Sequence, residues 1–224
     1  MVKSIKTIYL KFRNWFPIFK LAHKQYCEKL RKEYQGGEEN ITLLASNCIG
    51  GEIYYDLGLK FNSPTINLWM VQPDFLKLAK NLQYYIDLDL VFNDKLENKY
   101  NCPVGLLGKN EKETIMLVFL HYKTREEAYS KWNERKKRIN YDRIALLMSD
   151  RDGITYEDLI EFGKIPCWRK VVFTYKDYPE LVYTFRLEQE KGKEYVRNYQ
   201  IKKWNTFWRW ESQFNCAKWL IEEK

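Results

Sequence analysis

Histidine is scarce in this chain, and its cysteines follow no regular spacing. Among 224 residues there are two histidines, His23 and His121, and five scattered cysteines without a CxxC pair. Structural zinc sites need clustered cysteine and histidine ligands, and disulfide frameworks use an even, patterned set of cysteines. We therefore expect neither a metal site nor a disulfide framework.

Long hydrophobic runs are also absent. No apolar stretch approaches the roughly 20 residues that a membrane-spanning helix needs. The first residues carry positive charge but have neither a continuous apolar core nor a small-residue cleavage site, so they do not resemble a secretory signal. These absences predict a cytoplasmic protein.

Aromatic residues and positive charge are abundant instead. The chain contains 17 Tyr, 12 Phe and 8 Trp, and its formal net charge is +8. Such a charge favours anionic partners, which include a membrane surface, phosphorylated substrates and nucleic acid. No nucleic-acid-binding module is recognisable and the basic residues concentrate near the termini, so we do not expect nucleic-acid binding.

The order of apolar segments predicts an α/β fold. Strand patterns and helix patterns alternate along the chain, which favours a mostly parallel sheet with helices on both faces, built from Rossmann-like βαβ units. The expected strands are 41–45, 65–71, 115–121, 144–148 and 170–175. The expected helices are 49–57, 73–82, 124–138 and 156–162.

Basic aromatic segments flank this α/β domain. Residues 1–37 are predicted to form an amphipathic helix, in which Pro17 is the expected place of a kink, followed by a linker. The α/β domain is predicted to cover 38–200. Residues 201–224 form a second aromatic and basic helix, which we expect to pack on the α/β domain. Trp, Tyr, Lys and Arg in such helices suit peripheral contact with an anionic membrane.

The most informative stretch is 41–58, where a strand pattern passes into a helix pattern through small residues. Ser46, Asn47 and Cys48 end the strand, and Gly50 and Gly51 open the helix. A helix N-terminus suits a phosphate or an oxyanion, and the pKa of a thiol at that position tends to fall. The alternative is a buried cysteine beside a glycine turn. The spacing matches neither a P-loop nor the dinucleotide fingerprint.

Two further strand ends carry polar side chains. His121 and Tyr122 follow one apolar run, and Ser149, Asp150 and Asp152 follow another. Because the carboxyl ends of parallel strands share one sheet edge, we expect these groups to meet Cys48 in one cleft.

Two chemistries fit this convergence. Cys48 and His121 would make a nucleophile and its base. Alternatively, His121 or Asp150 would deprotonate an acceptor hydroxyl while the Gly50-Gly51 helix end holds a donor phosphate. The structural alternatives are a strand-end histidine bonded to a backbone carbonyl, and an Asp150–Asp152 turn rather than a cation site.

The densest charge run is 131–138, KWNERKKR. Such a run usually forms a solvated helix face. It could also form the wall of a cleft that receives an anionic donor, in which case Lys131 and Arg135 would contact the substrate together with Ser46, Asn47 and Tyr122.

Two separated motifs resemble the bacterial family of domain of unknown function 1919. ITLLASNCIGGEIYYDLGLKFNSPT is similar to the family pattern SNN-C-x-GG-x-IY…LG…SPT, and FLHYKTREEAYSKWNER is similar to FLHY-x-x-x-EEA-x-x-KW-x-x-R. The matching residues are Ser46, Asn47, Cys48, Gly50, Gly51, Ile53, Tyr54, Ser63, Pro64, Thr65, Phe119, Leu120, His121, Tyr122, Glu126, Glu127, Ala128, Lys131, Trp132 and Arg135. The resemblance covers about 40–200 and leaves the helix before residue 34 outside.

The resemblance implies a role in capsule or exopolysaccharide biosynthesis. We accordingly expect a transferase that moves a glycosyl group from a nucleotide-sugar donor to a saccharide, which could be lipid-linked at the inner face of the plasma membrane. One alternative is a Cys48-dependent acyl transferase or hydrolase on saccharides, with acyl-coenzyme A as a co-substrate. Another is a saccharide-binding protein without catalysis.

Overall fold

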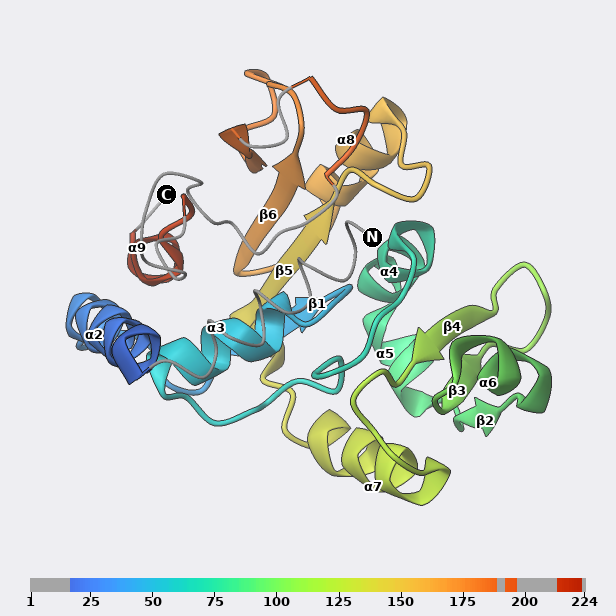
Figure 1. Ribbon diagram of the computed structural model, residues 1–224. Helices are drawn as coiled ribbons and strands as arrows, with labels where there is room; N and C mark the ends of the chain where they lie inside the picture. The colour runs from blue at the N-terminus through green and yellow to red at the C-terminus, as the bar shows by residue number, and fades with distance from the viewer. Residues whose placement is uncertain (1–16, 189–191, 197–212, 223–224) are drawn as a thin grey trace, which may run out of the picture.

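Two β-sheets form the framework of the part of the chain that the computed structural model describes, residues 17–188, 192–196 and 213–222 (Figure 1). One sheet is parallel, with the strand order β1-β5-β6-β7. Its strands are β1 (Thr42–Ala45), β5 (Ile144–Ser149), β6 (Arg169–Thr174) and β7 (Thr184–Arg186). The other is antiparallel, with the order β2-β3-β4. Its strands are β2 (Val91–Phe92), β3 (Val104–Leu107) and β4 (Ile115–Val118).

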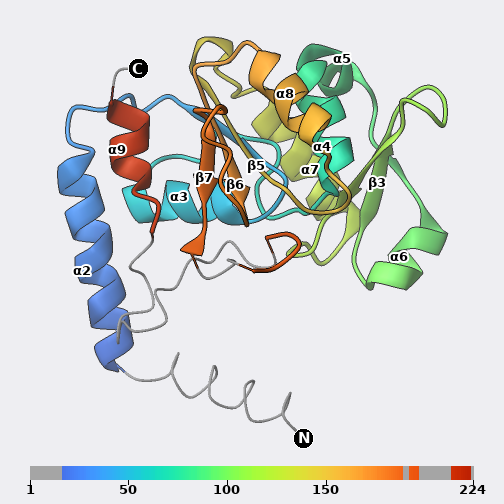
Figure 2. The same ribbon diagram turned by 90° about the horizontal axis from the view of Figure 1, so that it is seen from above.

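Helices cover both faces of the parallel sheet, as the alternation of the sequence predicts (Figure 2). Helices α2 (Pro17–Glu33), α3 (Ile49–Leu57) and α9 (Cys216–Ile221) cover one face. Helices α4 (Gln72–Lys80), α5 (Leu82–Asp87), α7 (Arg125–Lys136) and α8 (Tyr156–Lys164) lie on the other side, and α6 (Asp94–Tyr100) flanks the antiparallel sheet. The α/β class with helices on both faces is therefore confirmed.

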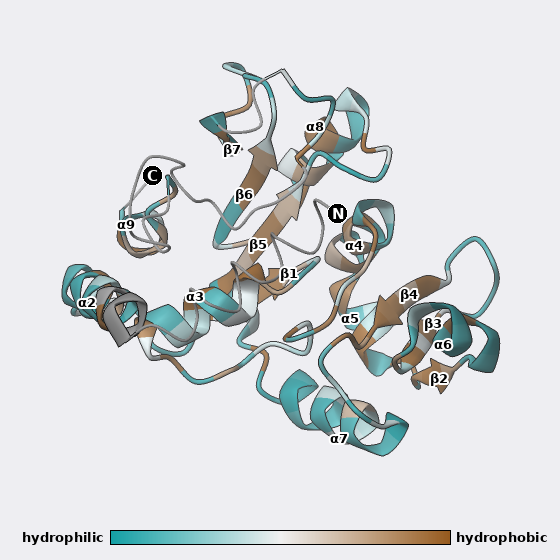
Figure 3. Ribbon diagram, in the orientation of Figure 1, coloured by the Kyte–Doolittle hydropathy of each residue, from teal (hydrophilic) through white to brown (hydrophobic). Residues whose placement is uncertain are grey.

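Successive side chains of the parallel strands point into two different hydrophobic cores, one on each face of the sheet. Leu43 and Leu147 point to the core under α2 and α3, whereas Leu44 and Leu146 point to the core under α4 and α8. Successive side chains of a strand face opposite sides, so a strand that is covered on both faces must be apolar throughout. Figure 3 shows this hydrophobic character along β5 and over the later part of β6, whereas the start of β6, which carries Arg169 and Lys170, is hydrophilic.

Two expected strands are wrong. Residues 65–71 form turns and one isolated bridge, in which Trp69 pairs with Val118. Residues 115–121 yield the short strand β4, which is antiparallel to β3 and belongs to the second sheet, not to the centre of the parallel one. Helix α4 packs against β4, so the apolar side chains of β4 are buried. The sequence of β4 is therefore as apolar as that of a central strand in a parallel sheet.

Capping residues and glycines in the sequence predicted the bounds of several helices correctly. Helix α3 spans Ile49–Leu57 as expected and ends at Gly58, whose φ of 74° suits a glycine. Thr124 caps α7 by accepting a hydrogen bond from the Glu127 N–H. Thr155 and Asp158 form a reciprocal capping box at the start of α8.

The outer edge of β1 is closed by side chains instead of a neighbouring strand. The Tyr54 hydroxyl accepts a hydrogen bond from the Leu43 N–H and donates one to the Ile41 carbonyl, both at 2.9 Å. Thr65 Oγ1 accepts from the Ala45 N–H at 3.1 Å. These bonds satisfy backbone groups that an open strand edge would leave without partners.

The flanking basic segments are described only in part. Helix α2 packs on α3 and α9, and Phe214 contacts Phe173 of β6 with ring centroids 5.1 Å apart. Residues 1–16 and 197–212 lie outside the described residues, and with them most of the aromatic-basic pattern expected at both ends. Of the helices in the described ranges, none is both long and apolar enough to cross a bilayer.

We expect Tyr54→Phe to destabilise the fold by about 2 kcal/mol. The substitution leaves the buried Leu43 N–H and Ile41 carbonyl without their partner, and an unsatisfied buried polar group costs roughly 1–3 kcal/mol. Urea unfolding would measure the loss. The matched control is Tyr55→Phe, because Tyr55 is 62% exposed whereas Tyr54 is fully buried. Equal effects of the two substitutions would contradict this account of the β1 edge.

Candidate functional site

Cys48 and His121 are brought together although 73 positions separate them in the sequence. The Sγ atom of Cys48 lies 3.2 Å from Nε2 of His121. Cys48 is half-buried and His121 is exposed, so the pair lies at the surface, where a ligand can reach it. Two of the three strand-end groups that the sequence singles out therefore do meet.

Cys48 faces His121 because another side chain caps the helix. Cys48 occupies the N-cap position of α3 but makes no side-chain capping bond. The Oδ1 atom of Asn47 instead accepts from the Ile49 N–H at 2.9 Å, and Nδ2 of Asn47 donates to Ser46 Oγ at 3.2 Å. Asn47 and Ser46 thereby hold the turn and leave the thiol free to point outward.

His121 is held by its buried neighbour in the turn after β4. The Tyr122 hydroxyl donates to the Ile66 carbonyl at 2.8 Å and accepts from Nη1 of Arg135 at 2.6 Å. The Phe119 N–H donates to the Pro103 carbonyl at 2.9 Å. With Phe119 and Tyr122 both fixed, the position of His121 between them is set by the backbone.

A single extended segment connects the two strand ends. The Met70 N–H donates to the Ser46 carbonyl at 2.9 Å, and Trp69 exchanges two hydrogen bonds of 2.8 Å with Val118. Ser46 directly follows β1, and Val118 is the last residue of β4. The segment therefore places Cys48, two residues beyond Ser46, beside His121, three residues beyond Val118.

Burial raises the pKa of the Cys48 thiol above its ordinary value, and the nearby Glu52 carboxylate raises this pKa further. The sequence led us to expect a lowered pKa at a helix N-terminus, and this expectation is wrong because desolvation outweighs the helix dipole here. A protonated thiol is the resting form at neutral pH. Nucleophilic attack would therefore need a base, and Nε2 of His121 is within hydrogen-bonding distance.

A pocket of about 320 Å³ lies over the exposed face of α3 beside this pair. Its lining residues are His23, Cys48, Gly51, Glu52, Tyr55, Asp56, Asn67 and His121. Asn67 adopts a left-handed conformation with a φ of 62°, a strained backbone of the kind that clusters at functional sites. Sequence reasoning missed Asn67, and only its type and its place in the NSPTIN turn could have drawn attention to it.

The first turn of α3 offers backbone donors next to the thiol. Among the described residues, neither Gly50 N–H nor Gly51 N–H has an acceptor, whereas the Ile49 N–H is capped by Asn47 and the Glu52 N–H donates to the Cys48 carbonyl. A Cβ atom at position 50 would lie 3.2 Å from Cβ of Ala45, so a glycine lets the helix pack closely on β1. Unpaired amides at a helix start suit an oxyanion.

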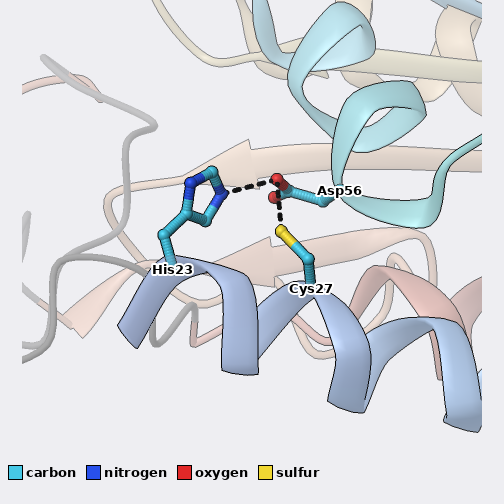
Figure 4. Close-up of side chains that lie close together, drawn as sticks. All are labelled: His23, Cys27 and Asp56. Atoms are coloured by element: carbon cyan, nitrogen blue, oxygen red, sulfur yellow. Dashed lines mark hydrogen bonds and ion pairs between the residues drawn. The ribbon is translucent and has the colours of Figure 1, made fainter. Parts of the chain in front are cut away.

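A second group of reactive side chains lies between α2 and α3 (Figure 4), and two of its members, His23 and Asp56, also line this pocket. His23 and Cys27 project from α2 toward Asp56 of α3. Nε2 of His23 lies 2.9 Å from Oδ1 of Asp56, and Sγ of Cys27 lies 3.4 Å from the same oxygen. Sequence reasoning missed this group, although the four-residue spacing of His23 and Cys27 puts both on one helix face.

The other expected substrate-binding residues have structural contacts. Ser46 and Asn47 are buried in the turn before α3, and Tyr122 with Arg135 ties α7 to the Ile66 carbonyl. Lys131 pairs with Glu134 on its own helix at 2.7 Å. None of these five residues lines the pocket beside Cys48, whereas Gly51 does.

Asp150 is not brought into this pocket. Its carboxylate accepts hydrogen bonds from the Tyr175 N–H at 2.9 Å and the Val196 N–H at 3.0 Å, and only 6% of the residue is exposed. Burial raises its pKa to about 6, and the two backbone bonds oppose the rise. Asp150 thus fastens the end of β5 to the segments after β6 and around residue 196.

We expect Asp150→Asn to flatten the pH dependence of stability between about pH 4 and pH 6. Because the folded pKa is the higher one, the folded protein keeps a proton that the unfolded chain has lost. This contribution, about 2–3 kcal/mol, is therefore present at low pH and is lost as the pH rises through about 6. Urea unfolding at several pH values would measure it, with the exposed Asp142→Asn as control. An unchanged slope in Asp150→Asn would contradict the assignment.

Comparison with known proteins places this site in a family. Residues 20–221 match the family described as "Domain of unknown function (DUF1919)". The match begins within α2, so the expectation that this helix lies outside the resemblance is wrong. An uncharacterized protein of Haemophilus influenzae is 32% identical over 183 residues, which are 81% of this chain and 84% of the relative. The chain therefore belongs to the family of domain of unknown function 1919.

Proposed function

We propose that the protein is a cysteine-dependent acyl transferase or hydrolase with Cys48 as nucleophile and His121 as base. The observation that carries the proposal is the 3.2 Å separation between Sγ and Nε2 at the mouth of a pocket. A thiol within hydrogen-bonding distance of an imidazole is the arrangement that covalent catalysis by cysteine requires. Among the described residues His121 has no second hydrogen-bond partner, and the proposal therefore rests on these two side chains.

The chemistry follows from the positions of these groups. Sγ of Cys48 attacks the acyl carbonyl carbon while Nε2 of His121 takes the thiol proton. The Gly50 and Gly51 N–H groups are the donors available to the oxyanion that forms. The imidazolium then gives its proton to the departing alkoxide or thiolate. His121 next deprotonates a sugar hydroxyl or a water, which attacks the thioester and releases Cys48.

The acceptor in this proposal is a saccharide of bacterial surface-polysaccharide assembly, either free or lipid-linked, and acyl-coenzyme A is a suitable donor. The saccharide acceptor rests on the family resemblance. The proposed cytoplasmic location and peripheral contact with an anionic membrane rest instead on the sequence, which lacks long apolar runs and carries basic aromatic segments at both ends. A pocket of about 320 Å³ falls at the lower end of the range for small-ligand sites. That size favours a short acyl group and part of one sugar ring over a whole nucleotide sugar.

Glycosyl transfer from a nucleotide sugar is the second candidate. The observation that favours it is that the Gly50 and Gly51 N–H groups at the start of α3 have no acceptor among the described residues and would suit a donor diphosphate. In that case His121 would deprotonate the acceptor hydroxyl and Cys48 would be replaceable. A rise in melting temperature with uridine or guanosine diphosphate sugars, but not with acyl-coenzyme A, would favour this candidate.

We expect Cys48→Ser to abolish acyl transfer from acetyl-coenzyme A or p-nitrophenyl acetate, and His121→Gln to slow it about 10²- to 10⁴-fold. Intact-mass analysis of the wild type should show one acetyl group, and peptide mapping should place it on Cys48. Cys102→Ser is the matched control, because Cys102 is half-buried and outside the pocket.

Two results would contradict this proposal. One is full turnover by Cys48→Ser with an unchanged melting temperature. The other is acetylation of Cys102 at the rate of Cys48, since that would mean chemical reactivity without a built site. Binding of a saccharide without turnover in any variant would instead indicate a saccharide-binding protein.

We expect Glu52→Gln to make Cys48 more reactive. Removing the carboxylate charge lowers the thiol pKa and so raises the thiolate fraction at pH 7. The rate of alkylation of Cys48 by iodoacetamide, followed by mass spectrometry, would measure the change. Glu157→Gln on the exposed start of α8 is the control. A rate that falls in Glu52→Gln would show that Glu52 acts through something other than its charge.

A further inference from the structure

We propose that His23, Cys27 and Asp56 form a binding site for a divalent transition metal, most suitably Zn²⁺. This site is distinct from the Cys48–His121 pair and does not depend on the proposed acyl chemistry. It contradicts the expectation from the sequence that the chain has no metal site.

The ligand atoms are already grouped. His23 Nε2, Cys27 Sγ and a carboxylate oxygen of Asp56 all lie within 4.8 Å of one another. Neighbouring ligand atoms around a tetrahedral Zn²⁺ are separated by about 3.3–3.8 Å, given metal–ligand bonds of 2.0–2.3 Å. The Sγ–Oδ1 distance of 3.4 Å falls in this range, and the Nε2–Oδ1 distance of 2.9 Å needs to lengthen by less than 1 Å.

The elements that carry the ligands are rigidly placed. His23 and Cys27 are one helical turn apart on α2, and Asp56 is in the last turn of α3. Arg31 of α2 donates hydrogen bonds of 3.0 Å to the Tyr55 and Asp56 carbonyls, which fixes the two helices against each other beside the cluster. Two ligands four residues apart on one helix, with a third on a neighbouring element, are a common way to build a zinc site.

The chemistry of the three ligands selects the metal. A thiolate, an imidazole and one carboxylate together suit Zn²⁺ and disfavour Mg²⁺ or Ca²⁺, which prefer oxygen ligands. On binding, the metal displaces the thiol proton of Cys27 to solvent, so that the ligand is a thiolate.

The cluster also has an open side. His23 and Asp56 line the same pocket as Cys48, so a metal at this end could keep one coordination position for water or a ligand oxygen. Asp56 lies eight positions after Cys48, about 12 Å along the helix axis, so the proposed metal and the Cys48 thiol are at opposite ends of the pocket. A metal here would anchor α2 on α3 and bind a second part of whatever occupies the pocket.

A helix-to-helix ion pair explains less of this arrangement. His23 and Asp56 alone would suffice to join α2 to α3. Cys27 contributes a third metal-binding atom, directed at the same carboxylate oxygen as His23. The ion pair leaves unexplained why an imidazole and a thiol both converge on one carboxylate oxygen beside a pocket.

Cobalt substitution tests the proposal directly. Reduced, chelator-treated full-length protein would be titrated with Co²⁺, which reports thiolate ligation through a near-ultraviolet charge-transfer band. We expect one equivalent to bind, the band to disappear in Cys27→Ser, and the band to persist in Cys48→Ser, the matched cysteine at the other end of the pocket. Zn²⁺ should displace Co²⁺ and raise the melting temperature of the wild type and of Cys48→Ser.

His23→Gln and Asp56→Asn supply variants that do not remove a buried thiol. Far-ultraviolet circular dichroism would first establish that each variant is folded, and the folded ones should lose Co²⁺ binding. No charge-transfer band in the wild type, or a band that survives in Cys27→Ser, would overturn the proposal. A band lost in Cys48→Ser but kept in Cys27→Ser would also overturn it, by placing the metal at Cys48 and His121.

Discussion

The backbone hydrogen bonds of Trp69 and Met70 are the contacts on which the candidate site depends. Trp69 pairs with Val118 at the end of β4, and the Met70 N–H bonds the Ser46 carbonyl at the end of β1. One short segment thus joins a parallel and an antiparallel sheet at the points where both strands end. Cys48 and His121 follow those points by two and three residues, so their 3.2 Å contact is a consequence of the junction. Because backbone bonds set the geometry, it does not depend on the side chains of the connecting segment.

The sequence predicted the elements of this fold better than their assembly. Helix α3 and the caps Thr124 and Thr155 follow from local chemistry that a short window contains. The assignment of β4 to the parallel sheet failed because Ile115–Val118 is buried by α4, and an apolar run does not reveal which sheet buries it. Cys48 and His121 were expected to meet at one edge of a parallel sheet. They do meet, but because the Trp69 bridge joins two sheets. The predicted contact is confirmed, whereas the predicted cause, a shared edge of one parallel sheet, is wrong.

The His23, Cys27 and Asp56 group could not be predicted from the sequence. His23 and Cys27 share a face of α2, which the helical period gives, but nothing local indicates that Asp56 of α3 lies opposite them. That placement comes from the docking of α2 on α3, which brings together residues 29 and 33 positions apart, and it is a tertiary property set by the core around Leu30 and Leu57. For Arg135, by contrast, the sequence suggested a binding role where the structure shows a structural one. Its charge suggested an anionic ligand, whereas burial and the Tyr122 hydroxyl make it a packing residue that holds α7.

The electrostatics of Cys48 decide what kind of nucleophile this site can offer. A helix N-terminus favours thiolate, but burial and Glu52 disfavour it more, and the net effect is a raised pKa. A thiol that stays protonated at rest is protected from oxidation and from adventitious electrophiles, which react with the thiolate. Under the proposed mechanism, Cys48 becomes reactive only when an acyl group is bound, because His121 takes the thiol proton as Sγ attacks the acyl carbon. The weak resting nucleophile and the adjacent base are therefore complementary, and their 3.2 Å contact matters more than the helix dipole that first drew attention to this cysteine.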